Sequence, residues 1–240
     1  MLFERGHTLS LIKHHDTYFG YLGHVLFSGV DIYKGPSIYS MEKVGSLKGR
    51  RWGSAIVKDD KVFLFATRQK LLSRVPFVNP YEYQHIFLLE SDDGKTFGAP
   101  KKVLDGSAPF IYEEKGSFYL FFHRRNPHRI LFRQASNPQD MSVKSDSLLL
   151  TEVENTLSAP SIAFFDNTYW LACEFMRKGE AWKTVLFKSK RLSDFQLQKE
   201  PLLENGACAF QHIFDNRYIL TYSEPDGNGG WKMMVKESQL

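Results

Sequence analysis

The sequence predicts an all-β fold, a five-bladed β-propeller formed by one domain over residues 1–240. Three observations predict it. One hairpin-like pattern occurs five times and aligns without gaps. Its copies begin at residues 9, 53, 109, 160 and 209, which are 44, 56, 51 and 49 residues apart. A chain of 240 residues shared among five copies gives about 48 residues each, the length of one four-stranded propeller blade.

Each copy predicts a β-hairpin. A small or apolar anchor is followed by a short β-rich run, a two-residue polar turn and an aromatic-rich run. The copies are LSLIKHHDTYFGYLG, GSAIVKDDKVFLFAT, PFIYEEKGSFYLFFH, PSIAFFDNTYWLACE and AFQHIFDNRYILTYS. The turn pairs are His15-Asp16, Asp59-Asp60, Lys115-Gly116, Asp166-Asn167 and Asp215-Asn216. Most of these residue types favour tight hairpin turns.

The segments between hairpins predict two more strands in most blades. Third strands are expected at 24–27, 84–89, 129–133, 183–188 and 231–236, and outer strands at 45–47, 103–105, 151–153 and 202–204. The fifth copy stops after its third strand. Leu2-Phe3-Glu4 precedes the first hairpin in register with the outer pieces. We therefore expect this N-terminal strand to close the ring and cover an otherwise exposed edge.

Composition narrows the class of protein. Hydrophobic residues make up 42% of the chain, which excludes disorder for its bulk, and no apolar run approaches the roughly 20 residues of a membrane span. A net charge of +4 is too weak to indicate nucleic-acid binding. The opening MLFERGH is too short and too charged for a secretory signal. With only two cysteines, Cys173 and Cys208, no disulfide scaffold is expected, and the predicted location is cytoplasmic.

Three stretches carry a resemblance to a known group of enzymes. They are Ser107-Ala108-Pro109 followed by Gly116-Ser117-Phe118-Tyr119-Leu120, Ser158-Ala159-Pro160 followed by Thr168-Tyr169-Trp170, and Ser91-Asp92-Asp93-Gly94-Lys95-Thr96-Phe97. With them the chain resembles, over essentially its whole length, the five-bladed propellers of arabinanases, levansucrases and invertases, including glycoside hydrolase family 43. The resemblance implies a carbohydrate site on the axis, at the face where the innermost strands begin, with two catalytic carboxylates.

The carboxylates do not stand where the resemblance implies. Thr8, Ser107 and Ser158 occupy those positions, and a hydroxyl cannot replace a carboxylate as a base without a partner. Glu174 and Glu224 end equivalent strands of adjacent blades, one position out of register. They are the predicted catalytic pair. The alternative is that each caps a strand end or pairs with an arginine such as Arg177 or Arg68.

Basic and aromatic residues at the same face predict a binding site. The candidate substrate-binding residues are His7, Arg51, Trp52, Arg68, His123 and Arg124. Arginine recognises carboxylate and phosphate groups bidentately, so this side of the face suits a sugar acid, a sugar phosphate or phosphate. Two structural alternatives stay open: strand-end arginines paired with Asp105, Glu154 or Glu204, and a tryptophan that belongs to the core.

No cofactor or metal is expected. The histidines lack helical metal-ligand spacing, and the glycine-rich Gly227-Asn228-Gly229-Gly230 precedes a strand where a phosphate loop would precede a helix. The predicted function is a glycosidase-like hydrolase or phosphorylase acting on a small glycan or charged sugar in an axial funnel. The alternatives are a catalytically inactive sugar-binding propeller accessory to glycan synthesis and a propeller that binds other proteins through its rim. The predicted partner is a carbohydrate or sugar phosphate, without nucleic acid or membrane.

Overall fold

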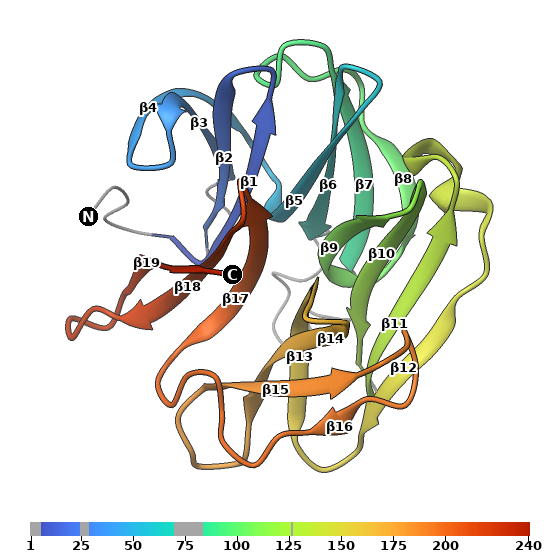
Figure 1. The fold of residues 1–240 in the computed structure, drawn as a ribbon, viewed down its shortest axis with the longest axis vertical. Helices are drawn as coiled ribbons and strands as arrows, with labels where there is room; N and C mark the ends of the chain where they lie inside the picture. Colours follow the sequence, from blue (N-terminus) through green and yellow to red (C-terminus); the bar gives the residue numbers. More distant parts are fainter. Residues whose placement is uncertain (1–5, 25–28, 70–83, 126) are drawn as a thin grey trace.

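Five β-sheets surround one axis. The computed structural model describes residues 6–24, 29–69, 84–125 and 127–240, and the sheets follow one another around the ring in chain order (Figure 1). The innermost strands are β1, β5, β9, β13 and β17, and each contacts the innermost strand of the next blade. The five-bladed β-propeller predicted from the repeats is confirmed.

Four of the five sheets have four strands, and each strand pairs with its neighbour in antiparallel fashion. The first blade holds β1 (Thr8–His14), β2 (Thr17–Gly23), β3 (Val30–Ser37) and β4 (Ser40–Leu47). The second holds β5 (Arg51–Lys58), β6 (Lys61–Gln69), β7 (Gln84–Ser91) and β8 (Lys101–Asp105). The third holds β9 (Ser107–Glu114), β10 (Ser117–Arg124), β11 (His128–Ala135) and β12 (Ser147–Glu152).

The fourth blade ends in a very short strand and the fifth has three strands. The fourth holds β13 (Thr156–Phe165), β14 (Thr168–Met176), β15 (Lys183–Ser189) and β16 (Gln196–Leu197). The fifth holds β17 (Ala207–Phe214), β18 (Arg217–Pro225) and β19 (Trp231–Gln239). A 3-10 helix, Pro138–Val143, lies in the third blade. Among the described residues, no helix is long and apolar enough to span a lipid bilayer.

The five predicted hairpins are β1–β2, β5–β6, β9–β10, β13–β14 and β17–β18. In four of their turns both central residues have positive φ, as in Asp166 (50°) and Asn167 (50°). Two positive φ values match the right-handed twist of the flanking strands. The Asp, Asn and Gly residues at these turns adopt this backbone conformation readily.

Two predicted strands lie elsewhere. The third strand of the first blade, predicted at 24–27, is β3 at Val30–Ser37, and residues 25–28 are outside the described residues. His24 N donates to Gly29 O (3.3 Å), and Gly29 has φ +120° directly before the strand. The outer strand predicted at 202–204 is β16 at Gln196–Leu197. Leu202 and Leu203 hydrogen-bond to Thr184 as an isolated bridge without forming a strand, and Leu203 packs in one cluster with Tyr222 of the next blade.

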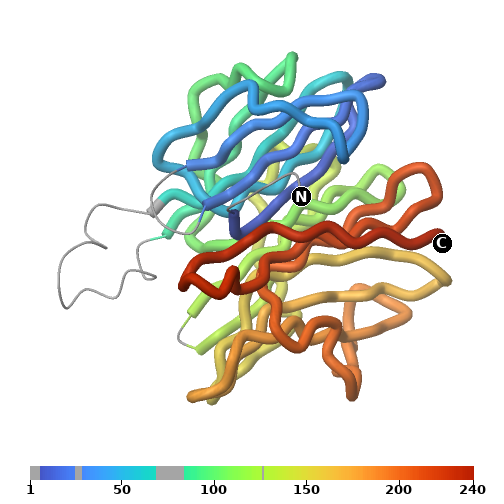
Figure 2. The backbone as a smooth tube through the Cα atoms, turned by 90° about the vertical axis from the view of Figure 1, so that its left-hand side faces the viewer, coloured from blue at the N-terminus to red at the C-terminus, as the bar shows by residue number. Residues whose placement is uncertain are grey.

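Ring closure brings the first described residues beside the last strand. The predicted closing strand Leu2-Phe3-Glu4 lies outside the described residues. Just after it, Gly6 N donates to Trp231 O in the fifth blade (3.4 Å), and His7 N donates to Gly23 O in the first (2.8 Å). Figures 1 and 2 both place the first and fifth blades side by side. This junction carries His7 to the axis.

The core is divided among the blade interfaces. One cluster joins the second and third blades through buried side chains such as Phe65 and Phe122, and another joins the third and fourth through Phe121 and Leu171. These four side chains come from the aromatic-rich second strands of the hairpins. Each buried apolar side chain of this size stabilises the fold by roughly 1.5–3 kcal/mol relative to exposure. The blades therefore hold one another in register around the axis.

Candidate active site on the propeller axis

One pair of residues from each blade faces the axis at the same level. In the strand register these pairs are Thr8 with Gly23, Arg51 with Thr67, Ser107 with His123, Ser158 with Glu174, and Ala207 with Ser223. All ten residues are buried. We call this set the axial ring. It lies where the innermost strands begin, the face that the sequence predicts for the site.

A backbone irregularity follows the ring in four blades. Trp52, Ala108, Ala159 and Cys208 each have positive φ, between 45° and 50°, and the strand register shifts at each of them. These residues pack together as one cluster. A bulge redirects the neighbouring side chains, and an L-residue with positive φ costs about 1–2 kcal/mol. The structure thus places four strained residues around one point on the axis, as functional sites often do.

Glu174 is the carboxyl of this ring. Ser158 Oγ donates to Glu174 Oε2 (2.6 Å) and Cys208 Sγ donates to Oε1 (3.4 Å). Burial raises the pKa of Glu174, although both hydrogen bonds and the charges of Arg125 and Arg51 oppose the rise. A buried carboxyl with a raised pKa keeps its proton at higher pH than usual and can act as a general acid.

His7 lies beside this carboxyl at the blade junction. Its Nδ1 is 3.5 Å from Ser223 Oγ, and its ring meets Trp231 edge-on at 5.4 Å between ring centres. Burial, together with the nearby Arg51 guanidinium, lowers the pKa of His7 to about 4. The imidazole is therefore neutral at neutral pH and is available as an acceptor or a ligand.

Arg51 and Trp52 form a stacked pair. The guanidinium carbon of Arg51 lies 3.5 Å from the centre of the Trp52 ring. Trp52 Nε1 is buried and has no hydrogen-bond partner among the described residues. A buried tryptophan N–H usually has a partner. The pair therefore offers a flat surface with an unused donor at its edge.

His123 belongs to a second polar group in the ring. Its Nδ1 is 3.4 Å from Ser107 Oγ, and its Nε2 is 2.9 Å from His128 Nδ1. The two imidazoles stack with 5.1 Å between their centres. Burial, then the neighbouring His128 and Arg125, lower the pKa of His123 well below its usual range. This histidine is neutral.

Three predicted site residues face away from the ring. Glu224, Arg68 and Arg124 each follow a ring residue by one position, and successive side chains of a strand point to opposite faces. Glu224 is partly exposed, forms an ion pair with Lys232 (3.5 Å) and lines a depression between the fourth and fifth blades. The structure does not bring it to Glu174.

The predicted arginine cluster is likewise divided. Arg124 pairs with Asp146 (2.6 Å) and donates to the backbone oxygen of Asp105 (2.7 Å). The exposed Arg68 lies opposite His85 on the neighbouring strand. Of the six predicted binding residues, the structure places His7, Arg51, Trp52 and His123 together on the axis. Arg124 is therefore a strand-end arginine paired with an acidic residue, which is the structural alternative to a binding role.

The sequence analysis missed Cys208 and His128 as members of the site. Each of these two residues joins the site through contacts with side chains from another strand, which the sequence alone does not show. One potential ligand atom each of His7, Glu174 and Cys208 lies within 4.8 Å of the other two, and all three residues are buried. This group has the chemistry to hold a metal ion such as zinc, which the sequence does not predict. His14, His15 and Asp60 form a second such group at the hairpin turns.

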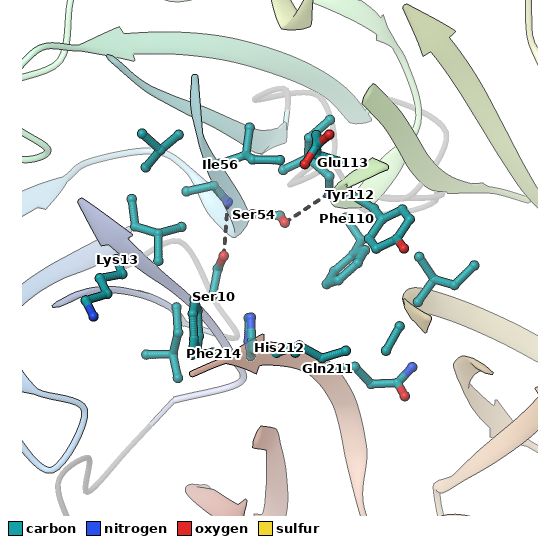
Figure 3. Close-up of a pocket in the computed structure, with 18 residues that line it drawn as sticks. Ser10, Lys13, Ser54, Ile56, Phe110, Tyr112, Glu113, Gln211, His212 and Phe214 are labelled. Atoms are coloured by element: carbon teal, nitrogen blue, oxygen red, sulfur yellow. Dashed lines mark hydrogen bonds between the residues drawn. The ribbon is translucent and has the colours of Figure 1, made fainter. Parts of the chain in front are cut away.

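The other half of the axis has a different character. A cavity of about 440 Å³ lies between the innermost strands, nearer the hairpin turns (Figure 3). Its serines connect neighbouring blades: Ser10 Oγ accepts from Ala55 N (3.0 Å) and Ser54 Oγ accepts from Ile111 N (3.1 Å). These hydroxyls are already used in joining the sheets. The reactive groups are concentrated in the axial ring.

No protein-family model matches the sequence, and no curated protein matches it significantly. Solved structures do match in shape. An endo-arabinase from Bacteroides thetaiotaomicron has a TM-score of 0.78 at 16% identity, covering 98% of this chain and 95% of that one. An α-L-arabinofuranosidase from Lactobacillus brevis gives 0.76 at 11%, covering 98% and 91%. A xylan β-1,4-xylosidase from Bacillus halodurans gives 0.77 at 14%, covering 98% of this chain and 53% of that one.

These structures have the architecture that the sequence motifs predict. The Ser-Ala-Pro anchors in the third and fourth blades fall at the axial ring, as the resemblance implies. At these identities the likeness concerns the fold. The chain has the five-bladed β-propeller fold of the family 43 glycoside hydrolases.

Proposed function

We propose that this protein is a glycosidase-like propeller that acts on a small glycan or charged sugar at the axial ring, with Glu174 as the proton donor. One observation carries the proposal: a buried carboxyl with a raised pKa stands on the axis of a propeller whose structural neighbours are glycoside hydrolases. Cleavage of a glycosidic bond requires protonation of the leaving oxygen. A carboxyl that stays protonated supplies that proton.

The position of Glu174 accounts for the missing carboxylate. Ser158 stands where the resemblance implies a glutamate, and Glu174 lies directly opposite it on β14. The 2.6 Å hydrogen bond places the carboxyl beside the serine. An acid on the second strand of the hairpin can thus reach the same part of the axis as an acid on the first. This supports a relocated proton donor in the fourth blade.

The Arg51–Trp52 pair supports sugar binding next to that acid. Glycan rings present apolar C–H faces and polar edges, which suit an aromatic face with an N–H at its rim. The buried guanidinium favours a substrate with a carboxylate or phosphate group. His7 lies between this pair and the acid, with 6.5 Å between the ring centres of His7 and Trp52. The substrate we propose is therefore a small glycan that carries an anionic group.

One observation favours a second candidate function, sugar binding without cleavage. Among the described residues, Glu174 is the only carboxyl in the axial ring. Glycosidases of this mechanism use two carboxyl groups. A propeller with one would hold a glycan and leave it intact. The same experiment separates the two functions.

The test is incubation with a pool of neutral and acidic oligosaccharides, with and without phosphate, followed by mass spectrometry. We expect new masses with the wild type and none with Glu174→Gln. Glu224→Gln is the matched comparison, because it removes an equivalent carboxyl that lies off the axis. We expect it to retain turnover. Loss of turnover in both variants would instead support the pair predicted from the sequence.

Three further outcomes are informative. Products that appear only with phosphate identify a phosphorylase. Retention of oligosaccharides without new masses supports the sugar-binding function. Neither cleavage nor retention, with the protein folded by circular dichroism, contradicts a carbohydrate site on this axis.

A further inference from the structure

Ser107, His123 and His128 form one chain of hydrogen-bonding groups across the third blade. The Ser107 hydroxyl lies 3.4 Å from Nδ1 of His123, and Nε2 of His123 lies 2.9 Å from Nδ1 of His128. The glycosidase mechanism proposed above uses none of the three side chains.

A neutral imidazole carries one proton, on either of its two ring nitrogens. The 2.9 Å contact between His123 Nε2 and His128 Nδ1 needs one proton between the two atoms. When His123 supplies this proton from Nε2, its Nδ1 is unprotonated and faces the Ser107 hydroxyl. In this series of hydrogen-bonding groups, His123 is the base beside Ser107, and His128 orients His123.

The equivalent serine of the next blade has a different partner. Ser107 and Ser158 both precede Ala-Pro at the start of an innermost strand and both lie in the axial ring. Ser158 donates to the carboxyl of Glu174 and has no imidazole beside it. Of these two serines, Ser107 is the one that faces an imidazole. Ser158 is therefore a matched comparison for the reactivity of Ser107.

The backbone holds Ser107 in place. Ala108 has φ +49° at the bulge, and its N–H donates to the Thr67 hydroxyl of the second blade (3.2 Å). Ser107 and His123 are both buried, whereas His128 is partly exposed. A strained residue next to a serine fixes the direction of its side chain. This is the local support that a nucleophile needs.

We propose that Ser107 is the nucleophile of an acyl-transfer activity that hydrolyses carboxylic esters of small alcohols, with His123 as the general base and His128 as its positioning residue. That the alcohol is a sugar hydroxyl rests on the proposed function. The ester chemistry itself does not depend on it.

The reaction is balanced with water as the co-substrate. Ser107 Oγ forms a bond to the ester carbonyl carbon while its proton passes to His123 Nδ1. The bond to the alkoxy oxygen breaks, and the alcohol leaves with that proton. Water then attacks the acyl-serine, again giving a proton to His123. The carboxylic acid leaves, and the Ser107 hydroxyl regains the proton.

A donor for the developing oxyanion lies nearby. Trp52 packs against Ala108, the residue next to Ser107, and its buried Nε1–H has no partner among the described residues. Donors of this kind stabilise the charge that forms on the carbonyl oxygen. The unused N–H is a second observation, independent of the histidine chain, that indicates a polar ligand at this point.

The first test uses the wild-type protein alone. A fluorophosphonate reagent reacts with serines that are activated as nucleophiles, and peptide mass spectrometry locates the adduct. We expect the adduct on Ser107 and not on Ser158. No adduct, or an adduct elsewhere with Ser107 unmodified, overturns the proposal. This readout needs no variant and no oligosaccharide, so its failure would leave the glycosidase test unaffected.

The second test measures hydrolysis of p-nitrophenyl acetate. Ser107→Ala should lower turnover to the background rate, and His123→Gln should lower it by roughly 10²-fold or more, the usual contribution of a general base. Ser117→Ala removes a hydroxyl at the distant end of the same hairpin and should leave turnover unchanged. Melting curves verify that each variant is folded. Wild-type turnover in a folded Ser107→Ala variant overturns the proposal.

Discussion

Ser158 donates its hydroxyl hydrogen to Glu174 across 2.6 Å, and the two residues lie opposite each other on β13 and β14. This relationship joins a serine at the expected place of a carboxylate to a carboxyl on the adjacent strand. It also gives a buried acid a fixed orientation on the propeller axis. The account of the site depends on this pair.

Removing the Ser158 hydroxyl should destabilise the protein. Ser158→Ala leaves an oxygen of the buried Glu174 without its closest donor, which costs roughly 1–3 kcal/mol in the free energy of unfolding. Urea denaturation measures the change. Ser117→Ala, at the distant hairpin end, should stay within about 0.5 kcal/mol of the wild type. Equal effects of the two substitutions would show that Ser158 contributes no special interaction.

Glu174 should give stability a defined pH dependence. Burial raises its pKa in the folded protein above the ordinary value of 4.5. The folded state therefore binds more protons than the unfolded state above pH 4.5, and the free energy of unfolding falls as pH rises from there towards the folded pKa. Glu174→Gln should remove this fall. Parallel stability curves for the two proteins between pH 4.5 and 8 would refute the raised pKa.

His212 should make the free energy of unfolding fall as the pH drops, the opposite of the effect of Glu174. It is buried, its Nε2 lies 3.3 Å from Leu9 O, and burial lowers its pKa to about 4 from the ordinary value of 6.5. The unfolded state binds more protons between these values, so stability falls as pH drops from 6.5 towards 4. The loss amounts to roughly 3 kcal/mol for this shift. His212→Gln should flatten that part of the curve, as urea titrations at several pH values would show.

The positive φ values around the axis predict an asymmetry between two alanines of β13. Ala159 has φ +45° whereas Ala163 does not have positive φ, and both are buried. Ala163→Gly should cost about 1 kcal/mol because glycine loses more conformational freedom on folding. Ala159→Gly also relieves the strain of an L-residue in the left-handed region. It should therefore cost about 1 kcal/mol less, by urea denaturation. A greater cost at Ala159 would contradict the strain.

The sequence predicts the blades well because each hairpin is a local unit. Alternation of side chains and the polar turn pairs determine β13–β14 from about 20 residues of chain, without reference to any other blade. The predictions failed where a choice depended on neighbours. Leu203 packs on Tyr222 of the next blade, and no local pattern in 202–204 reveals that contact.

The site was predicted less completely for the same reason. The sequence analysis chose Glu174 and His123, which lie in the axial ring, and also Glu224 and Arg124, which are one residue further along their strands than the ring residues. The register shifts at Ala108 and Cys208 decide which residue faces the axis. Cys208 reaches Glu174 from the adjacent blade, but His7 meets Cys208 and Glu174 only because the chain closes into a ring. A contact between residues about 200 positions apart leaves no local trace.

The most direct test of a carbohydrate site on this axis is a crystal structure of the Glu174→Gln variant with an oligosaccharide that the protein retains. We expect a sugar ring against Trp52, with its glycosidic oxygen within hydrogen-bond distance of the residue 174 side chain. A sugar bound instead in the depression beside Glu224, with the axial ring empty, would contradict the account.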